Sequence, residues 1–273
     1  MQDRRQQPGR PTPADQADGL RRLFAGRTLR FVPVISNPFV NFGGVLIERL
    51  CSTLDDLGLT TLLVDASERG GVPNELASFD LAEGIELLSA RVSYLAARGL
   101  PVQWVDSHGS TRAFLDAVAE AATGSEVVLI HGTALEMVRL FGRVGPGMPR
   151  PRPVLLCDDT VPAMTHAYAA LKILAQRADW RSHDLMMCAP PDTVQARRVA
   201  ERLGQCAEMF LGGVQRSWVQ IDPAEPATVA PSPALQQLVR QMLDTAATHT
   251  LSDQSGHGTL RPVLPAPRLP LSA

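Results

Sequence analysis

The sequence predicts an α/β fold, with a mostly parallel, twisted sheet of about seven strands and helices on both faces. Short apolar runs, such as RFVPVIS at 30–36 and TLLVD at 61–65, are typical of buried strands. Longer segments with apolar residues three or four positions apart separate these runs and are typical of helices. A chain of 273 residues suits one large domain of this kind with appendages.

Three regions are expected along the chain. A polar N-terminal arm at 1–28 contains one short helical segment, and an α/β domain follows at 29–248. A Pro-rich tail at 249–273 is expected to be disordered.

The elements follow from the two periodicities in chain order. A short helix is expected over 14–24, because Asp15 can accept backbone N–H groups at its start and Gly26 follows its end. Each expected strand is dominated by apolar residues, and each expected helix gathers its apolar residues on one face. The expected strands are 30–36, 60–65, 101–106, 126–131, 153–158, 184–188 and 214–220. The expected helices of the domain are 44–57, 79–98, 110–122, 133–142, 161–178, 192–208 and 232–248.

Composition excludes several classes of function. The 26 basic and 28 acidic side chains give a net charge of −2, which provides no general attraction for nucleic acid. The N-terminus is polar, and no apolar run approaches the roughly 20 residues that span a bilayer, so we expect a cytoplasmic protein. The four cysteines are spaced singly, which favours buried thiols over disulfides or a zinc site.

The loop after the first strand has the position of a phosphate-binding loop and little of its chemistry. Such a loop needs glycines, a lysine and a hydroxyl at the start of the following helix. Here the only lysine of the chain is Lys172, and Gly43 and Gly44 are followed by Val45 rather than by Ser or Thr. We expect Phe39 or Phe42 to fill the space of the phosphates, and we expect no ATP binding. The residues of this degenerate loop are Asn37, Pro38, Phe39, Val40, Asn41, Phe42, Gly43 and Gly44.

Polar side chains follow the expected strands. The carboxyl ends of parallel strands meet at one edge of a sheet, so such residues can converge on a metal or act as acid and base. They can equally cap the helices that follow. The candidates are Asp65, Asp106, His131, Asp158 and Asp159, with His108 in a neighbouring loop.

The last expected helix, 232–248, is amphipathic. Its polar face carries Arg240 as its only cation, which is poor for binding anionic lipid. We therefore expect it to pack on the domain, and membrane association to be weak or absent. Its apolar stripe consists of Leu235, Leu238, Val239, Met242, Leu243 and Ala246.

Four segments resemble the MinD/ParA-like P-loop ATPases. Ser36 is followed by NPFVNFGG where the family has SGKGGVGKT, and LLVDAS at 62–67 is similar to LLVDAD. VVLIHG at 127–132 is similar to a family strand whose terminal aspartate supports a magnesium-bound water, and His131 stands in its place. TVPAMTHAYAALKIL at 160–174 is similar to PxSxTDAYALIK. The resemblance implies a P-loop NTPase fold of the MinD type.

A fifth segment narrows the resemblance. DQADGLRRL at 15–23 resembles the N-terminal DQAxxLR motif of the flagellar number regulators of the FlhG (FleN) type. In that family the N-terminal helix activates FlhF, an SRP-type GTPase that places flagella. A flagellar transcriptional regulator or a switch-complex protein is a further partner that the resemblance implies, with location at the cell pole. The implied partner-binding residues are Asp15, Gln16, Leu20, Arg21 and Leu23.

The family's catalytic residues carry over poorly. Asp65 matches the first switch-region carboxylate and is the one weak catalytic candidate. Pro38 and Gly43 stand where the family has phosphate-binding lysines, and Gly44 stands where it has the magnesium-bound hydroxyl. The expectation is a regulator of flagellar number or placement whose ATPase-derived body has lost ATP and magnesium as cofactors.

Two other functions stay open from the sequence. The first is an active ATPase of the MinD/ParA type with an atypical loop, with ATP and magnesium as its cofactors. The second is an unrelated α/β enzyme that uses Asp65, Asp106 and His131. Nucleotide titration separates the regulator from the ATPase, and a metal bound to the purified protein would favour the enzyme.

Overall fold

The computed structural model describes residues 27–142, 150–191 and 193–251. Nearly all of them belong to one compact unit, Thr28–Thr250. The expected helix at 14–24 and residues 252–273 of the expected tail lie outside the described residues. The start of that tail is wrong, because residues 249–251 belong to the last strand of the domain.

Nine strands form a single sheet in the described part of the chain. Its order is β3-β4-β2-β5-β1-β6-β7-β8, with β9 paired to β1. The strands from β4 to β8 in this order are parallel, and β3 runs antiparallel to β4 at one edge. The α/β fold class is confirmed, with nine strands in place of about seven. The strands are β1 (Arg27–Ile35), β2 (Thr61–Asp65), β3 (Ile85–Leu87), β4 (Val92–Ala96), β5 (Val127–Gly132), β6 (Val154–Asp158), β7 (Ser182–Cys188), β8 (Val214–Ile221) and β9 (Ala247–Leu251).

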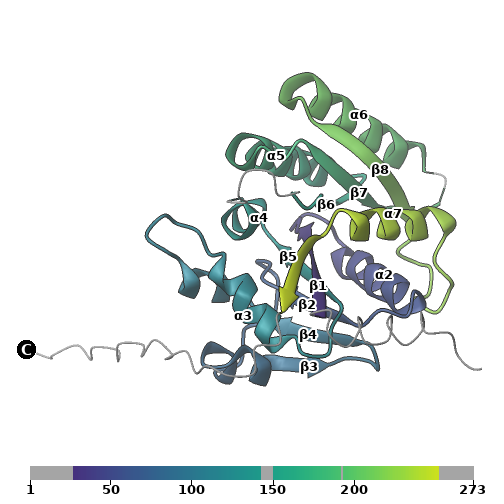
Figure 1. Ribbon diagram of the computed structural model, residues 1–273. Helices are drawn as coiled ribbons and strands as arrows, with labels where there is room; N and C mark the ends of the chain where they lie inside the picture. Colours follow the sequence, from purple (N-terminus) through teal and green to yellow (C-terminus); the bar gives the residue numbers. More distant parts are fainter. Residues whose placement is uncertain (1–26, 143–149, 192, 252–273) are drawn as a thin grey trace, which may run out of the picture. The chain divides into compact units, whose positions relative to one another are not determined.

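Six α-helices cover the sheet within the described ranges. They are α2 (Gly43–Asp56), α3 (Ala113–Ala121), α4 (Ala134–Phe141), α5 (Val161–Ala178), α6 (Val194–Leu211) and α7 (Pro233–Asp244). Figure 1 shows α2 and α7 together on one side of the sheet and the row from α3 to α6 on the other. Right-handed crossovers require this division, because the connection through α2 moves one way along the sheet and the connections through α3 to α6 move the other way.

The segment between β2 and α3 differs from the expectation. A helix over 79–98 is wrong, because this stretch contains the 3-10 turn Leu81–Gly84 followed by β3 and β4, and another 3-10 turn, Leu76–Ser78, precedes it. Gly84 allows the segment to pack closely, since a Cβ atom at this position would lie 2.5 Å from the Cβ atom of Ala77.

A strand over 101–106 is also wrong. This segment forms a 3-10 helix, Leu100–Trp104, entered through Gly99 at φ 79°. Pro101 lies at its start, where the missing N–H of proline is tolerated, and the same residue would interrupt a strand ladder. Trp104 packs edge-on against Phe114 of α3, with ring centroids 5.1 Å apart, so its ring is partly buried without strand pairing.

The last helix packs on the domain, as its stripe predicted. Leu235, Leu238 and Met242 are at most 1% exposed, and α7 contacts α2 and β8. The helix ends at Asp244, so its expected extension to residue 248 is wrong, and β9 follows at once. None of the helices in the described ranges is long and apolar enough to cross a membrane. Weak or absent association with lipid stays a prediction.

One part of the sheet lacks a helical cover. The connection from β2 to β4 contains 3-10 turns and β3 but no α-helix within the described chain. On the α2 side, β2 and β4 therefore line a cavity, and the flank of α2 forms much of its opposite wall. This missing cover, beside the carboxyl ends of the central strands, creates the candidate site.

Candidate functional site

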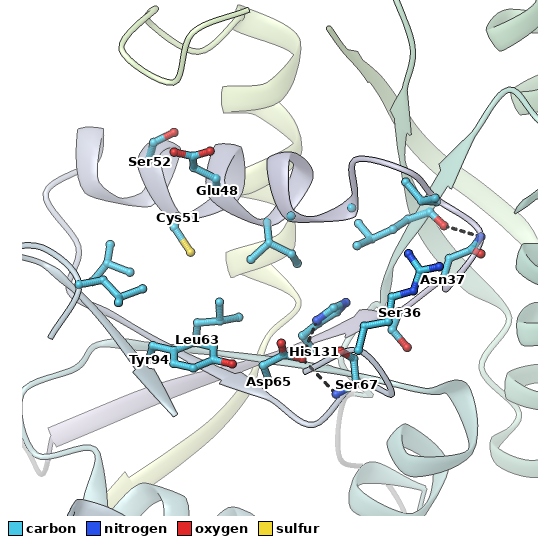
Figure 2. Close-up of a pocket in the computed structure, with 18 of the residues that line it drawn as sticks. Ser36, Asn37, Glu48, Cys51, Ser52, Leu63, Asp65, Ser67, Tyr94 and His131 are labelled. Carbon is cyan, nitrogen blue, oxygen red and sulfur yellow. Dashed lines mark hydrogen bonds and ion pairs between the residues drawn. The ribbon is translucent and has the colours of Figure 1, made fainter. Parts of the chain in front are cut away.

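A cavity of about 710 Å³ lies between α2, β2, β4 and the loop after β1. Its floor is mainly apolar, with Val40, Ile47, Leu63 and Leu156 among the contributing residues. Its polar end is formed by Ser36, Asp65 and His131 at the carboxyl ends of three adjacent strands, as Figure 2 shows. A cavity of this size at the carboxyl edge of a parallel sheet is a common type of ligand site.

Asp65 and His131 form an internal pair. The two residues are register partners on β2 and β5, so their side chains leave the same face of the sheet. His131 Nδ1 lies 3.0 Å from Asp65 Oδ1, and the same oxygen accepts the backbone N–H of Ser67 at 3.1 Å. Burial opposes ionisation of Asp65, but these hydrogen bonds and the charge of His131 outweigh it and lower its pKa. The pair thus gives this partly buried carboxylate a partner within the protein itself.

The loop after β1 is fixed by its own side chain. The Asn37 amide donates to the backbone oxygens of Leu156 at 3.0 Å and Ala163 at 2.9 Å, and its oxygen accepts the N–H of Phe39 at 3.1 Å. Val40 is 2% exposed and anchors the centre of the loop. The loop is therefore held in place without a phosphate.

The carboxylate of Asp158 lies beside a backbone N–H group of the loop after β1. Asp158 Oδ2 accepts the N–H of Asn41 at 3.4 Å, while its Oδ1 accepts the Thr160 hydroxyl at 2.6 Å and the Thr160 N–H at 2.9 Å. Asp158 is 5% exposed, so its charge is close to the loop and little screened. A buried anion beside this loop opposes a bound phosphate.

The expectation that an aromatic side chain fills the phosphate space is wrong. Phe39 and Phe42 are 51% and 55% exposed, and neither lines the cavity. Phe39 instead contacts the ring of His166 on α5, with ring centroids 5.7 Å apart. The rings turn outward because Val40 occupies the inner position of the turn. Pro38, Gly43 and Gly44 line the cavity, and its interior is open at this end.

The other polar candidates mainly form hydrogen bonds that stabilise the local structure. Asp106 accepts the N–H groups of His108 at 2.9 Å and Ser110 at 2.8 Å, and it does not line the cavity. The expected set of Asp65, Asp106 and His131 is therefore reduced to a pair. No cluster of three or more metal-ligating side chains occurs among the residues that the structure describes. The expected partner-binding residues lie outside the described part of the chain; they are Asp15, Gln16, Leu20, Arg21 and Leu23.

Three cavity residues were not predicted as site residues from the sequence. Ser36 directly follows β1, Tyr94 pairs with Leu63 across β4 and β2, and Glu48 lies on the cavity side of α2. Burial raises the pKa of the Tyr94 hydroxyl, which accepts the N–H of Gly71 at 3.4 Å. Side chains two positions apart on a strand share a face, so Ser36 lies on the same face as Val34. Val34 is the register partner of His131, so the strand pairing is needed to place Ser36 near His131.

Comparison with known proteins identifies the fold. The structure is similar to cobyrinic acid a,c-diamide synthase from Mycobacterium smegmatis with bound ADP and magnesium, with a TM-score of 0.54, 12% identity, and 81% and 99% of the two chains covered. A putative plasmid partition protein from Borrelia burgdorferi bound to AMPPNP matches with a TM-score of 0.51 and 7% identity, and the match covers 80% of this chain and 97% of that one. The MinD cell division protein of Aquifex aeolicus matches with a TM-score of 0.50 and 13% identity, and the match covers 79% of this chain and 97% of that one.

No protein-family model matches the chain, and no curated protein matches its sequence. The similarity is thus one of three-dimensional structure, and it spans almost the whole of each solved chain. The chain therefore has the fold of the MinD/ParA-type P-loop ATPases.

Proposed function

We propose that this protein regulates flagellar number or placement by acting on an SRP-type GTPase of the FlhF kind through its N-terminal segment. The observation that carries the proposal is the DQAxxLR-like match at 15–23, placed directly ahead of β1 of a MinD-type domain. A flagellar transcriptional regulator or a switch-complex protein is a second partner of the same proposal.

The α/β body acts in this proposal without nucleotide. Three features support that role: the loop lacks a lysine, Asp158 accepts one of the loop N–H groups, and the Asp65 carboxylate is paired with His131. In a P-loop site, lysine and magnesium neutralise the phosphates. Here the internal pair and the buried carboxylate occupy the corresponding edge of the sheet, and Lys172 lies exposed on α5.

We predict no measurable binding of ATP or ADP at millimolar concentration, with or without magnesium. Each lost charge-assisted phosphate contact removes about 1.5–3 kcal/mol of binding free energy, and several are lost together. Isothermal titration calorimetry on the full chain tests this prediction, with the thermal unfolding midpoint as a second readout. A micromolar dissociation constant with magnesium would establish the alternative, an active ATPase with an atypical loop.

The GTPase-activating role is tested by single-turnover GTP hydrolysis of an FlhF-type GTPase with the full chain added. We expect stimulation by the wild-type chain and at least about a tenfold loss with Gln16→Ala, the size of effect that one group positioned for the transition state can have. Gln7→Ala, in the same arm but outside the motif, is the matched control and should stimulate fully. Deletion of residues 1–26 leaves the whole described domain and should abolish stimulation.

Two results would contradict the activator role. One is a wild-type chain that binds the GTPase and leaves its rate unchanged. The other is full stimulation by the chain that lacks residues 1–26, which would place the activating surface on the α/β domain.

A further inference from the structure

We propose that the segment between β2 and β4 carries a docking surface for a basic amphipathic helix of a partner protein. This docking surface consists of the exposed apolar side chains of Leu76, Phe79 and Leu87 and the carboxylates around them. The proposal is independent of the regulatory role, because it uses neither residues 15–23 nor the cavity beside α2. It rests on the exposure of these apolar side chains, on the charge around them and on the shortness of β3.

Three large apolar side chains of this segment face solvent. Leu76 is 57% exposed, Phe79 82% and Leu87 74%. Leu76 and Phe79 belong to one turn, in which the Phe79 N–H donates to the Leu76 oxygen at 2.9 Å. Single exposed apolar residues are common on protein surfaces, whereas a group of them marks an interaction site.

Leu87 lies on the face of the sheet opposite to the cavity beside α2. Tyr94 lines that cavity, and successive side chains on a strand alternate between faces, so Leu95 points to the opposite face. Leu95 is the register partner of Ile85, and Leu87 follows Ile85 by two positions. Ile85, Leu87 and Leu95 therefore share this opposite face.

The 3-10 turns bring Leu76 and Phe79 to the same face. A Cβ atom at Gly84 would lie 3.0 Å from Leu95 Cδ1 and 2.5 Å from Ala77 Cβ, so both turns pack beside Leu95. Ala77 is 1% exposed and fixes the first turn against the domain, while its neighbours on that turn stay in solvent. The three apolar side chains of the docking surface therefore lie on one side of the sheet.

Carboxylates accompany these apolar side chains. Residues 70–90 contain four acidic side chains and no Lys, Arg or His. Glu86 lies on the cavity face, whereas Glu75, Asp80 and Glu83 are exposed next to the apolar side chains in the chain. The second turn also contacts α3, which adds the exposed Glu120. Such a field attracts a cationic partner and repels nucleic acid and anionic lipid.

The short β3 decides the form of the partner. β3 is the edge strand of the sheet, but it has only three residues, so an added strand would gain few backbone hydrogen bonds. Recognition therefore depends on side chains, and an amphipathic helix presents an apolar stripe with charges beside it. The ring of Phe79 is the expected anchor under that stripe, because aromatic residues often dominate such interfaces.

Fluorescence anisotropy of a labelled model peptide with the full chain tests the proposal. The probe is a helix of leucine and lysine, about 18 residues long, with an apolar stripe. One control peptide has glutamate in place of lysine, and the other has the same residues in an order without a stripe. We expect micromolar binding of the probe at low ionic strength, weakening with salt, and at least about tenfold weaker binding of both controls. Equal binding of the peptide without a stripe would overturn the proposal.

Variants locate the binding. Phe79→Ser should raise the dissociation constant of the probe at least about tenfold, and Glu83→Gln should raise it about threefold. Phe210→Ser is the matched control, because Phe210 is 66% exposed on α6 beside Arg198, and it should bind as the wild type does. Leu87→Ser keeps the test informative if Phe79→Ser fails to fold. Equal weakening by Phe79→Ser and Phe210→Ser would show non-specific adhesion and refute the docking surface.

Two further results would overturn the proposal. One is a dimer of the full chain in analytical ultracentrifugation that Phe79→Ser converts to monomers, which would make a second copy the occupant. The other is absence of probe binding at about 1 mM, which would show that the docking surface does not accept such a helix.

Discussion

Replacing His131 by aspartate is expected to destabilise the protein by about 2–4 kcal/mol at neutral pH. The substitution restores the residue type that the resemblance associates with this strand end, and it sets two carboxylates side by side at a register pair. Two like charges about 4 Å apart repel by about 4 kcal/mol at an effective dielectric constant near 20. Urea unfolding followed by circular dichroism measures the change, with His131→Asn as the control that removes the ring without adding charge.

The pH dependence of the two proteins should have opposite sign at this site. In the wild type the pKa of Asp65 is lowered, so its stabilising contribution is present above the unfolded value, about 3.9, and is lost as pH falls through the folded value. In His131→Asp the shared pKa is raised, so the variant regains stability relative to His131→Asn as pH falls from 7 to about 5. Equal stability of the two variants across this range would show that Asp65 is well solvated.

Arg152→Ala should destabilise the protein by about 3–5 kcal/mol, the usual effect of breaking one side of a buried ion pair. Arg152 Nε donates to Asp184 Oδ2 at 2.6 Å, and the Asp184 side chain is 0% exposed. Burial raises the pKa of Asp184, although Ser217 and Arg152 act against the rise. Without Arg152, the Ser217 hydroxyl at 2.6 Å is the one side-chain donor to this carboxylate that remains among the described residues.

Asp55→Asn is the matched control for the buried pair. Asp55 Oδ1 lies 3.3 Å from Arg91 Nε, and both side chains are nearly half exposed, so the change should stay within about 1 kcal/mol. Chemical denaturation of the three proteins in one buffer compares them directly. An Arg152→Ala protein as stable as Asp55→Asn would mean that water reaches Asp184.

The residues of the loop illustrate how far sequence reasoning reached. The missing lysine and the position of the loop between β1 and α2 were evident from the order of residues. The outward direction of Phe39 and Phe42 was not, because it depends on Val40 filling the inner position and on Asn37 bonding to β6 and α5. These contacts join residues more than a hundred positions apart.

The segment between β2 and α3 shows a second limit. Helical periodicity over 79–98 was outweighed by the close packing of Gly84 on Ala77 and by pairing of β4 with β2. Strand pairing depends on a partner elsewhere in the chain, so a local window does not contain it. The cavity owes its existence to this segment, since a helix there would have covered β2 and β4.

The sequence by itself determined the α/β class, the central strands, all six α-helices of the described domain to within a few residues at most ends, and Asp65 as a strand-end carboxylate. These features are encoded in local hydrophobic periodicity, which needs no knowledge of distant contacts. Tertiary structure alone decided that His131 pairs with Asp65, that Asp106 turns to its own loop, and that Ser36 opens into a cavity. The reason is that register between strands places side chains on a shared face, and register is set by long-range packing of the whole sheet.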